Sequence, residues 1–523
     1  MRKFILFSAL FFSTSLMAQY VHLEANKVNA FLSATPFLFS NINTNRAGYE
    51  VPKTNDFTGP KTIYNSSFWF GGLDNNGDLH TSINRSVNST VQLSFGPIAD
   101  DYFHPNYPLR YTKVYTVTKS EIQYHLNHFN DPGYVTPNNI LDWPANSFGN
   151  GEATLLAPYF NNYGSLLYQP EDGDVPLIRG DEAAFFILND ASPFTSMTNR
   201  TPLNIEVHIM VYQYHESGNL DSTTFINLKV INRSENTYQQ FKVANFTDFD
   251  IGGAEDDLAG SSSIRNLIYA YNGDNIDDAG SNPYKFGENP PACGIKLLNQ
   301  TMQSAAIFLN AGNYGGGGTE DTTFWNYLNA KWGDGSPMTV GGYGFNGTIP
   351  TNYMHDGSPT DTSSSTEFSN MNSLGDRRTL LTADPIDNFG PGDIICYDFA
   401  VITSRAGGNS LTNVDSLFAV ADYVQNFYDQ QTNYCEDVIL GENNFKQTNQ
   451  ALNLYPNPAQ NQISLYYEGD YNLSIIDLNG KTVFEQLNNT NSVKVELDIP
   501  NGLYVVKVIS EGKTNYTKLV INK

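Results

Sequence analysis

The sequence predicts a mainly β protein: β-sandwich structure in the body with one amphipathic helix, and an immunoglobulin-like β-sandwich at the C-terminus. Two observations favour this fold class. Short segments rich in β-branched and aromatic residues recur along the chain, separated by Gly, Asn and Asp residues. Helical periodicity, by contrast, stands out in one stretch, near residue 420. We divide the chain into five segments, at 1–18, 19–110, 111–440, 441–451 and 452–523.

Residues 1–18 have the composition of a secretory signal peptide. Arg2 and Lys3 precede a mostly apolar run over residues 4–12, and Leu16-Met17-Ala18 ends the segment. A charged start, a short apolar core and a small residue at the cleavage point are typical of such peptides. The run is short for a membrane span, so an uncleaved anchor is the less favoured alternative. No other segment approaches a membrane span, and we expect a soluble mature chain.

The charge of the chain is strongly acidic and lies in its body. The sequence has 54 Asp and Glu against 29 Lys and Arg, for a net charge of −25. Removal of the signal peptide takes away Arg2 and Lys3 and changes the net charge from −25 to −27. The segment from Leu452 onward has six Lys and seven acidic residues, a net charge of −1, so the body has a net charge of −26. Such a body repels nucleic acid and anionic lipid, and a cation is its natural small partner. The alternative is that the charge serves solubility alone.

In the N-terminal β-rich region, residues 19–110, the clearest strand covers Thr62–Asp74. We expect Gly71-Gly72 to end this strand and Asp74-Asn75-Asn76-Gly77-Asp78 to form the turn after it. The alternating side-chain oxygens of that turn are a possible calcium ligand set. A plain turn is the favoured interpretation.

The main β-rich domain, residues 111–440, contains further segments with strand patterns. They cover Tyr111–Thr118, Ile205–Tyr212, Phe225–Ile231, Phe241–Phe246 and Ile394–Thr403. The third and fourth flank Asn232–Asn236, which predicts a hairpin with a longer loop. Short elements paired over long sequence distances favour a β-sandwich.

One helix is expected before the linker. Thr412-Asn413-Val414-Asp415 has the spacing of a capping box. Apolar side chains then recur at helical spacing, at Val414, Leu417, Phe418, Ala421, Val424 and Tyr428. Such a stripe packs against a sheet far more often than it binds a ligand. Residues 441–451 are polar and unpatterned, and we interpret them as a linker.

The strongest candidate site in the body is acidic, and its candidate metal ligands are Asp248, Asp250, Asp256 and Asp257. Asp248 and Asp250 project to the same side of an extended segment, and the other two follow after Gly252-Gly253. Carboxylates this close together repel one another unless a cation or basic side chains lie between them. We therefore predict a calcium (Ca²⁺) site here, with a solvated acidic loop as the alternative.

Other catalytic and metal-binding patterns are weak. His125-x-x-His128 lacks the further ligands that zinc needs, so a histidine pair on a partly exposed strand is favoured. No Gly-x-Ser-x-Gly elbow, His-Glu-x-x-His motif or phosphate-binding loop occurs, which weighs mildly against an enzyme. The cysteines, Cys293, Cys396 and Cys435, allow one disulfide whose pairing stays open. Cys293 is expected to be structural rather than a nucleophile.

The C-terminal segment, residues 452–523, consists of short strand patterns separated by turn formers. They cover Gln462–Tyr467, Asn472–Asp477, Lys481–Leu487, Ser492–Leu497, Gly502–Ser510 and Thr514–Ile521. Asn479-Gly480, between the second and third, is a strong hairpin signal. Regularly spaced short strands of this kind predict a small β-sandwich.

Specific motifs of this segment identify a family resemblance. They are Tyr455-Pro456-Asn457-Pro458, Ile475–Lys481, Ile499–Val508 and Lys518–Lys523. In them the segment resembles the type A C-terminal sorting domain of proteins that the type IX secretion system of Bacteroidota exports. The resemblance covers the whole segment. It implies that the type IX translocon is a partner, that the chain reaches the outer cell surface or the medium, and that the tail is then removed.

The body carries a second series of motifs. It includes Thr62–Asp74, Ile140–Ala145, Leu156–Tyr159, Gly173–Glu182, Asp248–Gly252 and Gly375–Arg378. In this series the body resembles an uncharacterised module of large secreted Bacteroidota proteins, to which no activity is attached. We expect a surface binding or adhesion module for a glycan or protein ligand. The alternative is a secreted hydrolase of glycan or peptide whose site forms by spatial convergence.

Overall fold

The computed structural model describes most of the chain after residue 18. The described residues are 19–41, 44, 46–86, 91–162, 167–195, 201–215, 218–280, 283–310, 314–431, 435, 438–440, 453–477, 482–510 and 513–523. The predicted signal peptide and the predicted linker at 441–451 lie outside them. The chain divides into two compact units. The first consists of Met1–Gln123, Asn138–Pro158 and Ile178–Asp437. The second consists of Tyr124–Pro137, Tyr159–Leu177 and Val438–Lys523.

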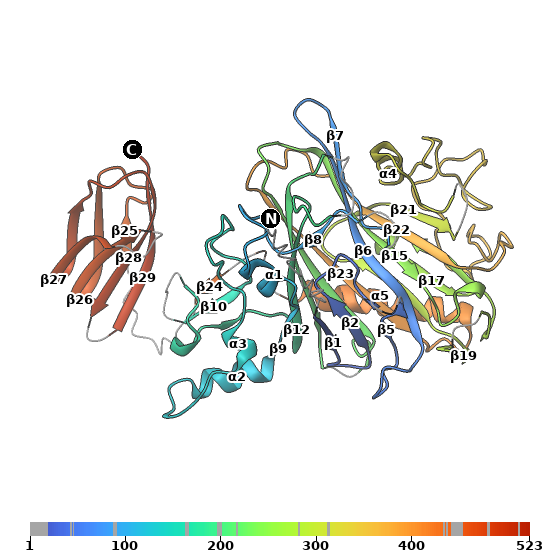
Figure 1. Cartoon of the computed structure of the whole chain (residues 1–523), viewed down its shortest axis with the longest axis horizontal. Helices are drawn as coiled ribbons and strands as arrows, with labels where there is room; N and C mark the ends of the chain where they lie inside the picture. Colours follow the sequence, from blue (N-terminus) through green and yellow to red (C-terminus); the bar gives the residue numbers. More distant parts are fainter. Residues whose placement is uncertain are drawn as a thin grey trace, which may run out of the picture. The chain divides into compact units, whose positions relative to one another are not determined.

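Within the described residues, the first unit contains an eight-stranded antiparallel sheet (Figure 1). Its strands, in spatial order, are β1 (Tyr20–Leu23), β2 (Asn29–Ser33), β5 (Tyr49–Glu50), β6 (Lys61–Leu73), β15 (Gln239–Phe249), β22 (Arg377–Ala383) and β21 (Met302–Leu309), with β7 (Leu79–Ser82) paired to β6. The pairing of β6 with β15 joins the predicted regions 19–110 and 111–440 in one sheet. The limits of those regions stay predictions.

A nine-stranded antiparallel sheet lies in the same unit, again counted over the described residues. Its strands, in spatial order, are β16 (Asp257–Ser262), β17 (Leu267–Asn272), β20 (Ala292–Leu297), β23 (Ile394–Ser404), β14 (Thr223–Asn232), β13 (Ile205–Gln213), β12 (Glu182–Asn189) and β8 (Ser94–Phe95), with β9 (Tyr115–Thr118) paired to β12. Two short pairs accompany the sheets, β3 (Ser40–Asn41) with β4 (Arg46–Ala47) and β18 (Ile276–Asp277) with β19 (Gly287–Glu288).

The two large sheets share one hydrophobic core. Buried side chains of both sheets form a single cluster, and the rings of Phe68 on β6 and Phe399 on β23 have centroids 5.2 Å apart. Burial of this apolar area is the main stabilising contribution. Along β13, alternate residues such as Val207 and Ile209 enter the core, as their spacing predicts. The prediction of a mainly β, sandwich-like body is confirmed.

Four short helices and one long helix are found among the described residues, together with three 3₁₀ turns. They are α1 (Asn106–Tyr111), α2 (Lys119–His128), α3 (Asn138–Leu141), α4 (Asp321–Tyr327) and α5 (Ser410–Asp429), with single 3₁₀ turns η1 (Pro170–Asp172), η2 (Ala254–Asp256) and η3 (Ser263–Arg265). The long helix α5 lies against β17, β20 and β23 and buries the predicted stripe from Val414 to Tyr428 (Figure 1). A β-sheet thus covers the apolar face of the one amphipathic helix that the periodicity predicts.

Three local predictions for the body are corrected. The capping box of α5 is formed by Asn409 and Thr412, three residues before the predicted one, because the Asn409 side chain accepts the Thr412 N–H at 2.9 Å. The segments at 225–231 and 241–246 are not a hairpin, since β14 and β15 belong to different sheets. The predicted strand Tyr111–Thr118 begins only at Tyr115, because helix α1 extends to Tyr111.

Gly71-Gly72 lies inside β6 instead of ending it. A Cβ atom on Gly71 would lie 3.1 Å from side-chain atoms of Leu328 and Trp325. The missing side chain therefore allows α4 and the residues after it to approach the outer face of the eight-stranded sheet. On the same face, the ring of Trp69 contacts Phe324 of α4 edge-on, at a centroid distance of 5.4 Å.

The second unit contains two small sheets within its described residues. One consists of β10 (Tyr159–Asn161), β11 (Val175–Pro176) and β24 (Val438–Leu440). The other, in the tail, consists of β25 (Asn453–Tyr455), β26 (Gln462–Asp477), β27 (Thr482–Glu496), β28 (Gly502–Ser510) and β29 (Lys513–Ile521). The predicted turn at Glu468-Gly469-Asp470 is an irregularity within β26, so two predicted strands form one long strand.

Candidate functional site

Three carboxylates meet at the edge of the first unit's eight-stranded sheet. Asp248 lies near the end of β15, Asp250 follows that strand, and Asp376 precedes β22. Carboxylate oxygens of the three residues lie within 4.8 Å of one another. Arg378 contacts two of them: its Nε lies 3.0 Å from Asp248 Oδ2, and its second terminal nitrogen lies 3.4 Å from Asp376 Oδ2. This acidic trio is the group of three candidate metal ligands that the described residues bring together.

Burial and mutual repulsion favour the protonated forms of the trio. Burial, together with the neighbouring Asp376 charge, raises the pKa of Asp248 to about 7, although Arg378 opposes this shift. Burial, followed by the charges of Asp248 and Asp376, raises the pKa of Asp250 well above its usual range. Burial also raises the pKa of Asp376. The trio therefore holds either protons or a compensating cation near neutral pH.

The sequence placed Asp248 and Asp250 correctly in one cluster but did not indicate Asp376. Asp256 and Asp257 fall outside the group within 4.8 Å. Asp257 Oδ2 accepts the Ile251 N–H at 2.9 Å, and Asp256 Oδ2 accepts the Ala279 N–H at 3.3 Å. Burial, then the charge of Asp256, raises the pKa of Asp257 well above its usual range. Their predicted role as metal ligands stays a prediction.

A long irregular segment, residues 333–376, ends at the acidic trio. We call it the 333–376 loop. Hydrogen bonds connect its two halves: Asn372 donates to Gly342 O at 2.8 Å, and Ser373 N–H donates to the Tyr343 hydroxyl at 2.9 Å. Trp332, just before the loop, donates its indole N–H to Gly344 O at 2.8 Å. These bonds fix the loop although it contains no strand or helix.

Aromatic rings pack along one side of the 333–376 loop. Phe345 stacks on Tyr314 with ring centroids 3.7 Å apart and planes 2° apart. Tyr343 stacks beyond Phe345 at 6.1 Å, with planes 15° apart. The buried ring of Trp332 meets Tyr314 edge-on at 4.9 Å. Tyr343, Phe345 and Tyr314 are half-buried, so part of the stack reaches the surface.

The remaining candidates from the sequence have structural partners. His125 and His128 lie on helix α2, so the prediction that they share a strand is wrong. His125 Nε2 lies 2.8 Å from Pro170 O, and His128 Nδ1 lies 2.7 Å from Asp131 Oδ2. Asp74 Oδ1 accepts the backbone N–H groups of residues 76 and 78, so the chain forms the predicted turn here.

The cysteine pairing that the sequence left open is Cys396 with Cys435, whose Cα atoms lie 5.9 Å apart. Cys293 is a free and fully buried thiol on β20. The Thr403 hydroxyl lies 3.5 Å from its sulfur. Burial raises the pKa of Cys293 to about 11, so the thiol is protonated at neutral pH and is a poor nucleophile.

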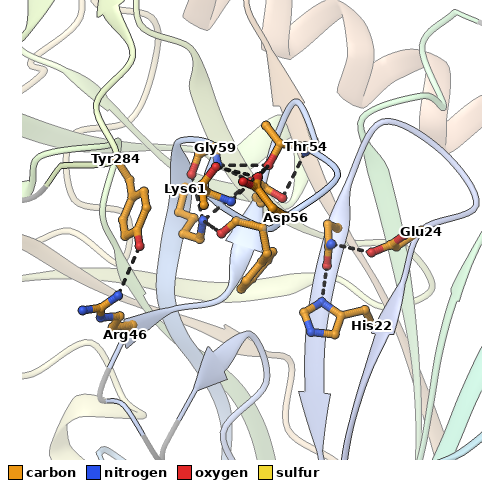
Figure 2. A network of polar contacts seen from close by, with 12 residues as sticks. His22, Glu24, Arg46, Thr54, Asp56, Gly59, Lys61 and Tyr284 are labelled. Carbon is orange, nitrogen blue, oxygen red and sulfur yellow. Dashed lines mark hydrogen bonds and ion pairs between the residues drawn. The ribbon is translucent and has the colours of Figure 1, made fainter.

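A buried lysine near the N-terminus forms a separate polar network, shown in Figure 2. Lys61 donates to the carbonyl oxygens of Phe57 and Gly59 at 3.0 and 2.8 Å, and lies 3.7 Å from Glu50 Oε1. Its Nζ also lies 4.2 Å from the ring centre of Phe57 and 4.4 Å from that of Tyr284. Burial lowers the pKa of the Lys61 amino group. The network satisfies this cation and anchors the loop before β6.

A cavity of about 120 Å³ lies beside Asp190. Its lining residues are Thr81, Gln92, Asp190, Ala191, Ser192, Thr195 and Pro202. The carboxylate of Asp190 accepts the backbone N–H groups of Leu203 and Ile205 at 2.7 and 2.8 Å. Both oxygens therefore hold the start of β13 in place, which is a structural role.

In the tail, the Tyr-Pro-Asn-Pro motif is attached to the last strand. The Asn457 side chain donates to Lys518 O at 2.6 Å and accepts the Val520 N–H at 2.8 Å. Ala459 N–H donates to Val520 O at 2.8 Å, and Asn522 N–H donates back to Ala459 O at 2.8 Å. The first and last motifs of the family resemblance therefore close one small β fold.

A family model described as the secretion system C-terminal sorting domain matches residues 453–522. This segment is a type IX secretion C-terminal sorting domain. The sorting domain indicates that the chain is exported and is then secreted or attached to the outer cell surface. It also implies interaction with the type IX secretion machinery. In the described part of the chain, no helix combines the length and apolar character needed to cross a membrane.

Comparisons beyond the sorting domain give little information about the body. A search of curated proteins finds no match to the chain. A solved structure titled polysaccharide lyase is similar at 10% identity, over 60% of this chain and 34% of that one, with a TM-score of 0.19. The chain thus spans about a third of the length of that protein. A likeness of this size carries no argument about the fold or activity of the body.

Proposed function

We propose that the first unit is an extracellular binding module, which the sorting domain delivers to the cell surface or the medium. The observation that carries this proposal is the concentration of exposed apolar side chains on the 333–376 loop. Exposed large apolar residues of this loop are Val340, Ile349, Phe368, Met371 and Leu374. Met371 is 89% exposed and Ile349 is 62% exposed. We infer that these side chains contribute to one apolar patch, a feature that is typical of interaction sites.

The loop is fixed before any ligand binds, which supports a role in recognition. Arg377 and Glu367 form a buried ion pair at 2.9 Å, and this pair fixes the end of the loop. The bonds from Asn372 and Ser373 hold its two halves together. A surface that is already ordered loses little conformational entropy on binding, so its apolar area contributes more fully to affinity.

The charge of the body restricts the ligand. With a net charge of −25 for the whole chain, the protein repels polyanions. The 333–376 loop offers exposed apolar side chains together with the half-buried Tyr343 hydroxyl. A neutral glycan or an uncharged to basic protein surface fits this chemistry, because either presents apolar faces beside hydrogen-bonding groups.

The test is a binding screen of the secreted chain on a glycan array and on a panel of immobilised neutral and basic proteins. We expect at least one ligand of neutral or basic chemistry, with binding reduced tenfold or more in Met371→Asp and Tyr343→Ala. Val135→Asp is the matched control, because Val135 is 82% exposed but lies outside the loop. Binding that these loop variants leave unchanged, or ligands that are all polyanions, would contradict the proposal.

A secreted hydrolase is the second candidate, and the acidic trio is the observation that favours it. Glycoside hydrolysis uses two carboxyl groups, of which one must be protonated near neutral pH. The pKa of about 7 at Asp248 suits such an acid. The contact with Arg378 and the burial of Asp248 weigh against substrate access. Hydrolysis of a glycan or peptide panel by the wild type, abolished in Asp248→Asn, would replace the binding function by this one.

A further inference from the structure

We propose that Asp248, Asp250 and Asp376, together with the neutral oxygen of Asn65, form a calcium site on the outer face of the eight-stranded sheet. The site is separate from the apolar surface of the 333–376 loop. It does not depend on the proposed binding function, but a calcium ion bound by ionised Asp248 would exclude Asp248 as the acid of the hydrolase candidate.

The sheet register places Asn65 beside the trio. Asp248 on β15 is directly opposite Asn65 on β6 and directly opposite Arg378 on β22. Directly opposed residues of an antiparallel pair share one face. Phe246, two residues before Asp248, stacks on Trp69 at 4.9 Å on the face that α4 covers. The row from Asn65 to Arg378 therefore lies on this outer face.

The charges of the trio are incompletely balanced. The guanidinium of Arg378 contacts two of the three carboxylates, those of Asp248 and Asp376. It also donates to Asn310 O at 2.9 Å and to Asn310 Oδ1 at 2.8 Å. Arg85 is a second basic neighbour, but it donates to Gly315 O at 2.9 Å. The ionised trio thus needs further positive charge in a region of low dielectric constant.

Unpartnered buried oxygens are an independent sign of a ligand. Asp248 is 6% exposed and Asn65 is 2% exposed, and the Oδ1 atom of each lacks a hydrogen-bond partner among the described residues. Asp376 Oδ1 is likewise a buried oxygen without a hydrogen-bond partner among the described residues. Buried polar atoms are nearly always paired in folded proteins, so orphaned oxygens beside a carboxylate cluster point to an ion. Asn65 is uncharged, so its orphaned oxygen is not a consequence of acidic clustering.

The donor set fits calcium better than other common ions. It is made only of oxygens, from carboxylates and one amide, and Ca²⁺ prefers such ligands at about 2.3–2.6 Å. Two oxygens on opposite sides of a calcium ion are thus about 5 Å apart, and the trio lies within 4.8 Å. The trio contains no histidine or cysteine, the usual ligands of zinc. An ion here would join the end of β15 to the end of the 333–376 loop through Asp376.

The first test is equilibrium dialysis of the purified full chain, freed of metal by chelation, against calcium chloride. We expect about one ion per chain, with a Kd below about 1 mM, as in other extracellular calcium modules. Absence of bound calcium up to 10 mM in the wild type would overturn the proposal, whatever the behaviour of any variant.

The second test locates the ion by thermal unfolding with and without calcium. The wild type is expected to gain a saturable rise in Tm, because calcium binds the folded state. Asp376→Asn and Asn65→Leu should lose most of this rise, whereas Asp256→Asn and the exposed Asp334→Asn should keep it. If the calcium-dependent rise in Tm is lost in Asp256→Asn but retained in Asp376→Asn, the ion binds elsewhere and the assignment is overturned. A Tm of the wild type that does not respond to calcium, together with a fall of Tm toward neutral pH that is smaller in Asp376→Asn, would show that the trio holds shared protons instead.

Discussion

Arg377 and Glu367 form an ion pair that is excluded from solvent. The Nε atom of Arg377 lies 2.9 Å from Glu367 Oε2, and both side chains are buried. Glu367 Oε2 also accepts the Ala259 N–H at 2.8 Å, and Arg377 donates to Ser373 O at 2.6 Å. One pair thus connects the 333–376 loop to strands of both large sheets, because Ala259 belongs to β16 and Arg377 to β22.

Removal of the Glu367 carboxylate is expected to destabilise the first unit strongly. In Glu367→Ala, Arg377 remains buried without its ion-pair partner, and we expect a loss of about 3–5 kcal/mol in the free energy of unfolding. Urea denaturation measures this loss. The double variant Glu367→Leu/Arg377→Met should lose less than the single variant, because it buries no lone charge. The control is Glu288→Ala, which should change stability little because Glu288 is exposed. Equal stability of Glu367→Ala and Glu288→Ala would show that the buried ion pair does not stabilise the first unit.

The disulfide between Cys396 and Cys435 is expected to stabilise the first unit. It closes a loop with a sequence separation of 39. Loop-closure entropy alone predicts a stabilisation of about 4 kcal/mol as an upper value. Cys396→Ser/Cys435→Ser should therefore unfold at lower urea concentration, and reductant should no longer change its midpoint. In a thiol assay of the unfolded, unreduced chain we expect one free thiol, that of Cys293. Three free thiols would show that Cys396 and Cys435 do not form a disulfide.

Asp190 is expected to make stability depend on pH. Burial raises its pKa to about 7, although backbone N–H groups and His80 oppose the shift. Because the folded-state pKa lies above the usual value, stability is fully present below about pH 4 and falls as pH rises through 7. The size of the fall is about 2–4 kcal/mol. Denaturation between pH 4 and pH 8 should show a smaller fall in Asp190→Asn than in the wild type. Parallel pH profiles for the two proteins would contradict this assignment.

Asn457 is expected to be needed for a stable sorting domain and for export. In Asn457→Ala, two hydrogen bonds that attach the Tyr-Pro-Asn-Pro motif to β29 are lost. In a host with a type IX translocon, we expect more of the variant to remain in the periplasm than of the wild type. Asn461→Ala, at an exposed position four residues later, is the control. Equal export of all three chains would show that this attachment is dispensable.

Local sequence patterns predicted the strands and helices in which the order of apolar and polar side chains follows their burial. Alternation from Ile205 onward predicted β13, and the stripe from Val414 to Tyr428 predicted the buried face of α5. The hairpin prediction for β14 and β15 was wrong because side-chain alternation does not specify the partner of a strand. Residues 233–238 instead carry the chain from one sheet to the other, and both strands are buried on both faces.

The candidate site was predictable only where its residues are close in sequence. Asp248 and Asp250 are two positions apart, and that spacing indicated a shared side of the chain. Asp376 and Asn65 join them through the pairing of β15 with β22 and β6, and no local signal in the sequence reveals that register. Asp256 and Asp257 are adjacent in sequence, but η2 turns the chain so that one oxygen of each, Oδ2, accepts a backbone N–H group outside the trio.

The bond between Cys396 and Cys435 also has a mechanical consequence. Cys435 follows helix α5, and its partner lies on β23, a central strand held between β14 and β20. A pulling force that reaches Cys435 from the C-terminal side therefore enters β23 through a covalent bond and bypasses α5. Tension on a chain tethered through its tail would load the interior of a sheet, where many hydrogen bonds resist together, and would leave the helix unstretched.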